Sequence, residues 1–117
     1  MPHSHPDAGT ILEVTIAYLE DDLYPKLTGV DRYHSRVTIN ALRIVQRELA
    51  RGPAADAADQ AELRALLDAP AHATALDDQL AREIREGRRP IDDDPLRGYL
   101  KNTLRRALEI NNPKWLA

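Results

Sequence analysis

The sequence predicts an all-α fold, a four- or five-helix antiparallel bundle, and three observations support this. Apolar residues recur at intervals of three and four, which is the spacing of one face of an α-helix. Helix-stopping residues separate these apolar segments, at Gly52-Pro53, Pro70 and Gly87. No segment alternates apolar and polar residues with the two-residue period of a strand. Short connections predict that sequential helices pack antiparallel.

The first predicted helix begins at Thr10, where Thr10 and Glu13 have the spacing of a capping box. Asp7 is the competing cap. Pro25 and Gly29 end the helix. Its apolar residues are spaced by threes and fours: Leu12, Ile16, Leu19 and Leu23.

The second predicted helix runs from Asp31 to Arg51 and stops at Gly52-Pro53. Its apolar face is broad, so we expect it to pack against two neighbours and to lie centrally. The residues of this face are Tyr33, Val37, Ala41, Ile44 and Val45, widened by Leu42 and Leu49.

Three further helices are predicted over residues 53–69, 74–87 and 94–111. The first begins at a proline, which suits the first turn of a helix. Thr74 caps the second, and Asp94 caps the third, in which proline is the first helical residue.

The domain organisation follows from the chain length of 117 residues, which is typical of one domain. We expect a single helical domain over residues 1–117, with a flexible N-terminal tail (1–9) and a C-terminal tail (113–117).

Composition excludes several functional classes. The net charge of -3 argues against a general nucleic-acid-binding role. The absence of cysteine excludes thiolate metal sites and thiol nucleophiles. No signal peptide or membrane span is predicted, and we expect a cytoplasmic protein. No metal or cofactor is predicted, because His3 and His5 follow Pro2, which lacks the amide of an amino-terminal copper site.

A polar stripe on the second predicted helix is the main candidate site. Arg36, Asn40, Arg43 and Arg47 follow one another at offsets of four, three and four. Guanidinium groups in such a row suit phosphate or carboxylate ligands. The alternative is a solvated face paired with acidic residues of neighbouring helices. Glu48 projects toward the apolar face, so a packed helix predicts an arginine partner for it.

The C-terminal segment holds further candidates. Asn111 falls within the apolar arc of the last helix, which indicates a buried cap or a ligand contact. Trp115 follows Pro113 and Lys114, and it either folds back on the bundle or anchors a partner. A second basic row lies on the same helix: Arg97, Lys101 and Arg105.

Five short blocks carry a resemblance that covers most of the chain. They are Tyr33-His34-Ser35-Arg36-Val37, Asn40-Ala41-Leu42, Arg47-Glu48-Leu49 with Gly52-Pro53, Ile84-Arg85-Glu86-Gly87, and Leu108-Glu109-Ile110-Asn111-Asn112-Pro113-Lys114. The sequence resembles a bacterial domain family of unknown function. Its members are small helical proteins, often encoded beside aminoglycoside-phosphotransferase-like kinases and acyl-CoA dehydrogenases.

The resemblance implies a role in acyl-CoA or hydroxy-acid breakdown, as an accessory to the kinase-like protein. It also implies functional positions, which are His34, Arg36, Asn40, Glu48, Asn111 and Lys114.

Three functional hypotheses follow. The first is a non-catalytic accessory or adaptor protein, because no catalytic motif is found. The second is a protein, or an enzyme, that binds a carboxylate, phosphate or CoA group through Arg36 and Asn40 with His34 beside them. The third is a homo-oligomer whose exposed aliphatic residues close on a two-fold axis. The candidate ligand- or partner-binding residues are His34, Arg36, Asn40, Arg43, Arg47, Glu48, Asn111, Lys114 and Trp115.

Overall fold

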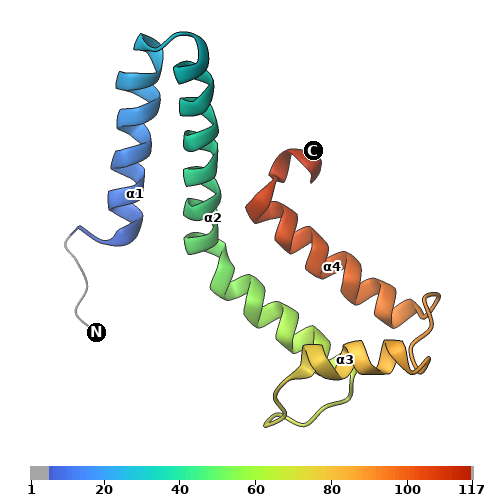
Figure 1. Ribbon diagram of the computed structural model, residues 1–117. Coiled ribbons are helices and arrows are strands. Elements are labelled where there is room, and N and C mark those ends of the chain that lie inside the picture. Colours follow the sequence, from blue (N-terminus) through green and yellow to red (C-terminus); the bar gives the residue numbers. More distant parts are fainter. Residues whose placement is uncertain (1–5, 117) are drawn as a thin grey trace. The chain divides into compact units, whose positions relative to one another are not determined.

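The computed structural model describes residues 6–116, and over this range the protein is helical and has no strand (Figure 1). The all-α prediction is confirmed. The described residues form four α-helices, the lower of the two predicted numbers. The chain divides into two compact units, one up to Gly52 and one from Pro53 onward. The single-domain prediction stays a prediction.

The first helix, α1 (Ala8–Ala17), begins two residues earlier than predicted. The competing cap is the one used, since Asp7 Oδ1 accepts a hydrogen bond from the backbone N–H of Thr10 at 2.9 Å. Residues 1–5 of the predicted flexible tail lie outside the described range, and Ala8 and Gly9 already belong to α1. The flexibility of the tail stays a prediction.

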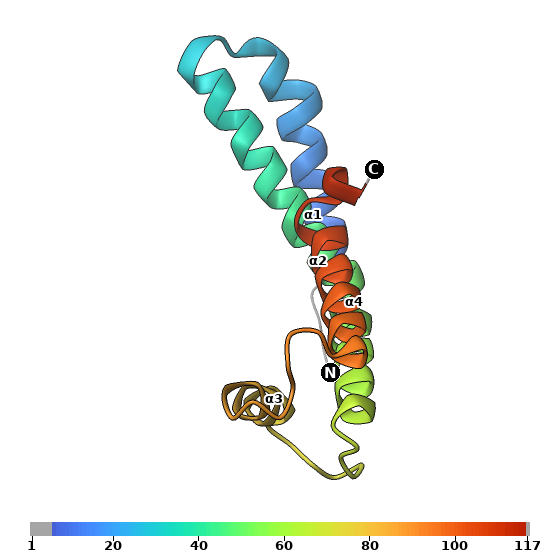
Figure 2. The same ribbon diagram turned by 90° about the vertical axis from the view of Figure 1, so that its right-hand side faces the viewer.

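The helical path continues beyond α1 in two short segments, the first wider and the second tighter than an α-helix. A π-helical segment, η1 (Tyr18–Leu23), is followed by a 3₁₀ turn, η2 (Tyr24–Lys26). Gly29 then adopts a φ of 60°, a left-handed conformation that glycine takes without steric cost, and the chain reverses there. Figures 1 and 2 both show α1 beside the first part of α2.

The second helix, α2 (Gly29–Leu66), is 38 residues long and runs through Gly52-Pro53. The predicted stop there is therefore wrong. Proline lacks the N–H for one intrahelical bond, but an alanine-rich stretch with high helix propensity follows it. The predicted second and third helices thus join into one, which accounts for four helices rather than five.

The first unit buries one side of α2 and leaves the predicted core face open. Ile16 of α1 and Ile39 of α2 are buried, Ile39 completely. By contrast, Tyr33 is 67% exposed and Val37 is 49% exposed. The prediction that this broad apolar face packs in a core is wrong for its exposed part, whereas Leu42 and Ile44 are half-buried. The reason is that α1 covers the side of α2 that carries Ile39.

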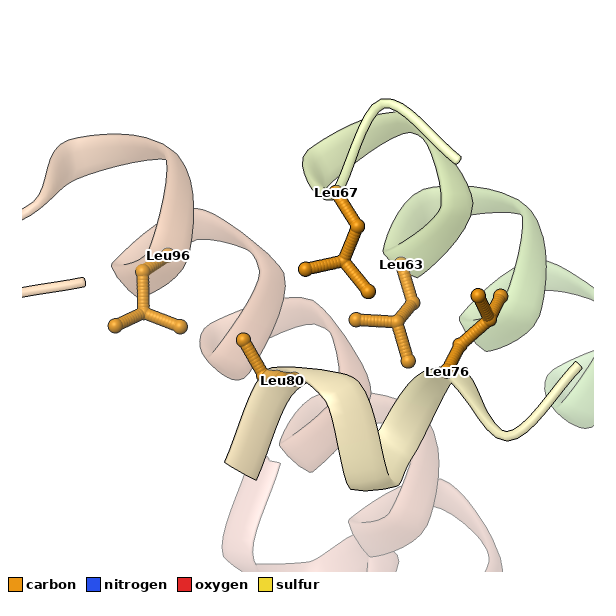
Figure 3. Close-up of a cluster of buried hydrophobic side chains, with 5 residues drawn as sticks. All are labelled: Leu63, Leu67, Leu76, Leu80 and Leu96. Carbon is orange, nitrogen blue, oxygen red and sulfur yellow. The ribbon is translucent and has the colours of Figure 1, made fainter. Parts of the chain in front are cut away.

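The second unit contains the end of α2, α3 (Leu76–Arg85), α4 (Asp94–Asn111) and a 3₁₀ turn, η3 (Pro113–Leu116). Its core is a cluster of leucines from all three α-helices (Figure 3), with Tyr99 packed against it. The members of this leucine cluster are Leu63, Leu67, Leu76, Leu80 and Leu96.

Helix boundaries in this unit lie within three residues of the prediction, since α2 ends at Leu66 rather than at residue 69 and the bounds of α4 agree with the predicted 94–111. Ala75, at a φ of 56°, precedes α3, so Thr74 is not its cap. Asp93 rather than Asp94 caps α4, with Oδ2 accepting from the Leu96 N–H at 2.9 Å. The predicted C-terminal tail forms the η3 turn over the residues described.

Two arginines hold the connections of the second unit. Arg64 donates to the carbonyl oxygens of Pro70 at 2.7 Å and Ala73 at 3.0 Å. Arg89 donates to the carbonyl oxygen of Leu66 at 2.6 Å, near the end of α2. These bonds satisfy carbonyl groups in and beside the loop that follows α2, where no helical N–H is available to them.

We expect Leu63→Ala to lower the free energy of unfolding by about 2–5 kcal/mol, because it leaves a cavity in the leucine cluster. Urea unfolding followed by circular dichroism measures this change. Ile91→Ala is the matched control, since Ile91 is 90% exposed, and it should change the value by less than about 0.5 kcal/mol. Equal effects of the two substitutions would contradict the assignment of the core.

Candidate functional site

An ion-paired cluster joins η1 to α2 in the first unit. Glu20 Oε2 accepts a hydrogen bond from Arg36 Nη1 at 3.1 Å, and Glu20 Oε1 accepts one from Arg43 Nη2 at 2.5 Å. Arg36 and Arg43 are seven residues apart, which places them two turns apart on one side of α2. One carboxylate therefore holds two successive arginines of the predicted stripe.

Tyr24 extends this cluster at the end of the π-helical segment. The guanidinium carbons of Arg32 and Arg36 each lie 4.3 Å from the centre of the Tyr24 ring. The negative face of an aromatic ring attracts such cations. We define the Glu20 cluster as Glu20, Tyr24, Arg32, Arg36 and Arg43.

The electrostatics of the cluster favour its charged forms. Hydrogen bonding from Arg36 lowers the pKa of the Glu20 carboxyl, and the charge of Arg43 lowers it further. Interaction with Arg36 and the charge of Arg32 lower the pKa of the Tyr24 phenol. Tyr24 and Glu20 together raise the pKa of Arg36. Three arginines and one glutamate leave the cluster with an excess of positive charge.

This geometry favours the paired interpretation of the arginine stripe for two of its members. A phosphate or carboxylate ligand would compete with Glu20 for Arg36 and Arg43. Asn40 of the same stripe is exposed, and Arg47 is half-buried. The ligand-binding hypothesis for the stripe stays a prediction.

Sequence reasoning missed the two residues that organise this cluster. The sequence patterns described above gave no role to Glu20 or to Tyr24. The available signal was position: Glu20 follows Leu19, at the edge of the apolar row of the first helix.

The remaining α2 candidates lie on its open side. His34 is exposed, and its ring centre is 5.7 Å from that of Tyr33. Glu48 is also exposed, with its carboxylate beside Gly52, where an added Cβ would lie 2.7 Å from Glu48 Oε1. The packed environment that led us to predict an arginine partner for Glu48 is absent, because this face of α2 is exposed.

The C-terminal candidates are exposed as well. Asn111 is the last residue of α4 and is exposed, so the predicted burial is wrong. The cap is Asn112, whose N–H donates to the Leu108 carbonyl at 2.8 Å. Lys114 is exposed, and Trp115 is 77% exposed in the η3 turn, with its backbone N–H bonded to the Asn112 carbonyl.

A groove of about 500 Å³ lies along the outer side of α4 and is open to solvent. Apolar side chains form its floor, and the basic row predicted from the sequence runs beside them. We call this surface the α4 groove; its lining residues are Ile91, Asp92, Leu96, Arg97, Leu100, Lys101 and Leu104.

A second ion-paired network holds α4 to α2 on the opposite side from this groove. Arg106 Nε donates to Asp59 Oδ1 at 2.7 Å, and its two terminal nitrogens bind the carboxylate oxygens of Glu62 at 3.1 and 2.7 Å. This two-pronged contact with Glu62 raises the pKa of Arg106 and lowers that of Glu62. The network fixes the register of the two helices.

Residues 6–116 contain no group of three or more His, Cys, Asp or Glu side chains placed to hold a metal ion. Over the same range, none of the helices has the length and apolar character needed to span a membrane.

The features above define a small all-α protein that presents an ion-paired helical hairpin in one unit and a basic, apolar groove in the other. Residues 25–115 match the model of a family described as a domain of unknown function, DUF6285, and the chain belongs to this family. No curated protein and no solved structure matches it.

We expect Glu20→Gln to destabilise the protein at pH 7, because the pairing with Arg36 and Arg43 is lost. The folded-state pKa of Glu20 lies below its ordinary value of 4.5. Its contribution is therefore complete above pH 4.5 and disappears as the pH falls through the lowered pKa. Urea midpoints measured from pH 7 downward should converge for the two proteins below pH 4.5.

Asp22→Asn serves as the charge-matched control, since Asp22 is exposed and lies in the same π-helical segment. It should leave the midpoint at pH 7 almost unchanged. A Glu20→Gln protein as stable as the wild type at pH 7 would show that the cluster does not support the fold.

Proposed function

We propose that the protein is a non-catalytic accessory protein that binds an enzyme of acyl-CoA metabolism through the α4 groove. The expected partners are a kinase-like phosphotransferase or an acyl-CoA dehydrogenase of the same bacterial cytoplasm. Their identity rests on the resemblance stated from the sequence, and the binding surface rests on the geometry of α4.

The observation that supports binding is the exposure of apolar side chains in the α4 groove. Ile91, Leu100 and Leu104 are all exposed, although each is a large aliphatic side chain. They lie beside one another in one groove. Water released from such a contiguous apolar surface favours association with a complementary surface.

The charges of the groove define the chemistry of the partner segment. Arg97 and Lys101 contribute two positive charges, and Asp92 contributes one negative charge. Arg105 continues the basic row along α4. A helix with apolar residues three or four positions apart and acidic residues beside them would match both features.

Trp115 supplies a further anchor for a partner. Tryptophan is enriched among residues that dominate binding energy, because it combines a large apolar surface with an N–H donor. Trp115 is mostly exposed on the short η3 turn. Its ring is therefore accessible to a partner, because it is not packed in the core of the second unit.

The test is isothermal titration of the purified protein with the two enzymes that the resemblance implies as partners, a kinase-like phosphotransferase and an acyl-CoA dehydrogenase. We expect one of them to bind, and Leu104→Glu to weaken binding at least tenfold, because it places a carboxylate on the apolar floor. Lys101→Glu should weaken binding as well, more strongly at low salt than at high salt.

Val14→Glu on α1 is the matched control, since Val14 is 63% exposed and lies outside the groove. It should leave the affinity unchanged. Binding of neither enzyme, or binding that Leu104→Glu does not alter, would refute the proposed surface.

A further inference from the structure

The outer face of α2 in the first unit is an extended apolar surface with no partner within that unit. We define it by the residues Val30, Tyr33, Val37, Ala41, Val45 and Leu49, all of which are exposed. At 1.5 Å per residue it extends over about 28 Å of helix. Contiguous apolar surfaces of this kind mark interaction sites in soluble proteins.

Within the first unit, α1 and η1 pack against a different side of α2. Ile39 is buried, and Arg36 and Arg43 are bound to Glu20, so α1 and η1 use the side that carries these residues. The sequence pattern of α2 indicates apolar contacts on two sides, whereas this hairpin supplies a neighbour for only one.

We propose that the outer face of α2 binds the same face of a second copy of this chain, with the two helices antiparallel and crossing at Ala41. A two-fold contact brings the same patch of both copies together, so the patch must be complementary to itself. The order of residues on either side of Ala41 meets this requirement.

The apolar residues are arranged symmetrically about Ala41. In an antiparallel pair, each residue faces a counterpart in the partner chain. A residue n positions before the crossing point faces the partner's residue n positions after the crossing point. Val37 and Val45 lie four positions before and after Ala41, and Tyr33 and Leu49 lie eight positions before and after it. These four side chains therefore each meet an apolar side chain of the second copy, whereas Val30, at the end of the face, lies level with Gly52.

The polar residues of this face follow the same symmetry. His34 and Glu48 lie seven positions before and after Ala41, and both are exposed. The antiparallel pair places an imidazole N–H donor level with a carboxylate acceptor, twice in the dimer. A parallel pair would instead place Glu48 against Glu48, which costs like-charge repulsion.

Ala41 suits the crossing point because its side chain is small. Packed helices lie 8–10 Å apart depending on the side chains at the contact. A residue of alanine size allows the close approach that brings the flanking valines together. Binding of a different protein would not require the residues on the two sides of Ala41 to match each other.

The first test is sedimentation velocity of the full chain over a range of concentrations. We expect a concentration-dependent dimer, and a dimer dissociation constant at least tenfold higher for Val37→Glu, which places a carboxylate among apolar side chains. Val14→Glu, on an exposed position of α1, should leave the dissociation constant unchanged. Circular dichroism should show the same helical content for all three proteins.

The second test exchanges the polar pair. His34→Glu places two carboxylates opposite each other, and Glu48→Arg places a guanidinium opposite an imidazole, so each should weaken the dimer about tenfold. The double variant, His34→Glu with Glu48→Arg, places a carboxylate opposite a guanidinium across the interface. Its dissociation constant should return to within a few-fold of the wild-type value.

Four outcomes would overturn the proposal. The wild type could sediment as a monomer at every concentration, or dimerise without any response to Val37→Glu. The double variant could also fail to recover the affinity lost in the single variants. A monomeric wild type in which Val37→Glu abolishes binding of the partner enzyme would assign this face to that enzyme, and would likewise overturn the proposal.

Discussion

The contact of Glu20 with Arg36 and Arg43 determines which side of α2 the first unit buries. The carboxylate uses both oxygens, one for each guanidinium, and the arginines lie two turns apart. This arrangement fixes α2 both in rotation about its axis and in register along it. Arg36 also contacts Tyr24, so the end of the π-helical segment is held by the same side chain.

The two proposed binding surfaces follow from which side of each helix is buried within its own unit. In the first unit the ion-paired side of α2 faces α1, and the apolar outer face of α2 remains open. In the second unit the leucine cluster buries one side of α4, and Arg106 anchors the helix to Asp59 and Glu62. The groove lies along the exposed side chains of α4 next to this cluster, and Leu96 contributes to both. In each unit, the ion pairs thus hold helices of that unit together, and apolar side chains remain exposed to solvent.

Helical periodicity and caps predicted the all-α class, the end of α4 and most helix positions. They did not predict which element covers each helix face. A sequence pattern indicates that Tyr33 and Val37 lie on the same side of a helix, but it does not identify the helix or protein that packs against that side. Pro53 was misread because proline opposes a helix locally, whereas the alanine-rich residues after it favour one. Glu20 was missed because its partners lie 16 and 23 residues away, beyond any local pattern.

The central claim, that two copies pair antiparallel at Ala41, is tested most directly by distances between spin labels. The chain has no cysteine, so Asn40→Cys and Val30→Cys each create a single labelling site. Asn40 is exposed and lies beside the crossing, about 100° round the helix from Ala41, so its label does not occupy the close contact. Position 30 lies eleven residues from the crossing, so the account predicts a short label-to-label distance at position 40 and about 33 Å at position 30. Short distances at both positions would indicate a parallel pair, and no dipolar coupling at either would indicate that the face does not pair; each result would contradict the account.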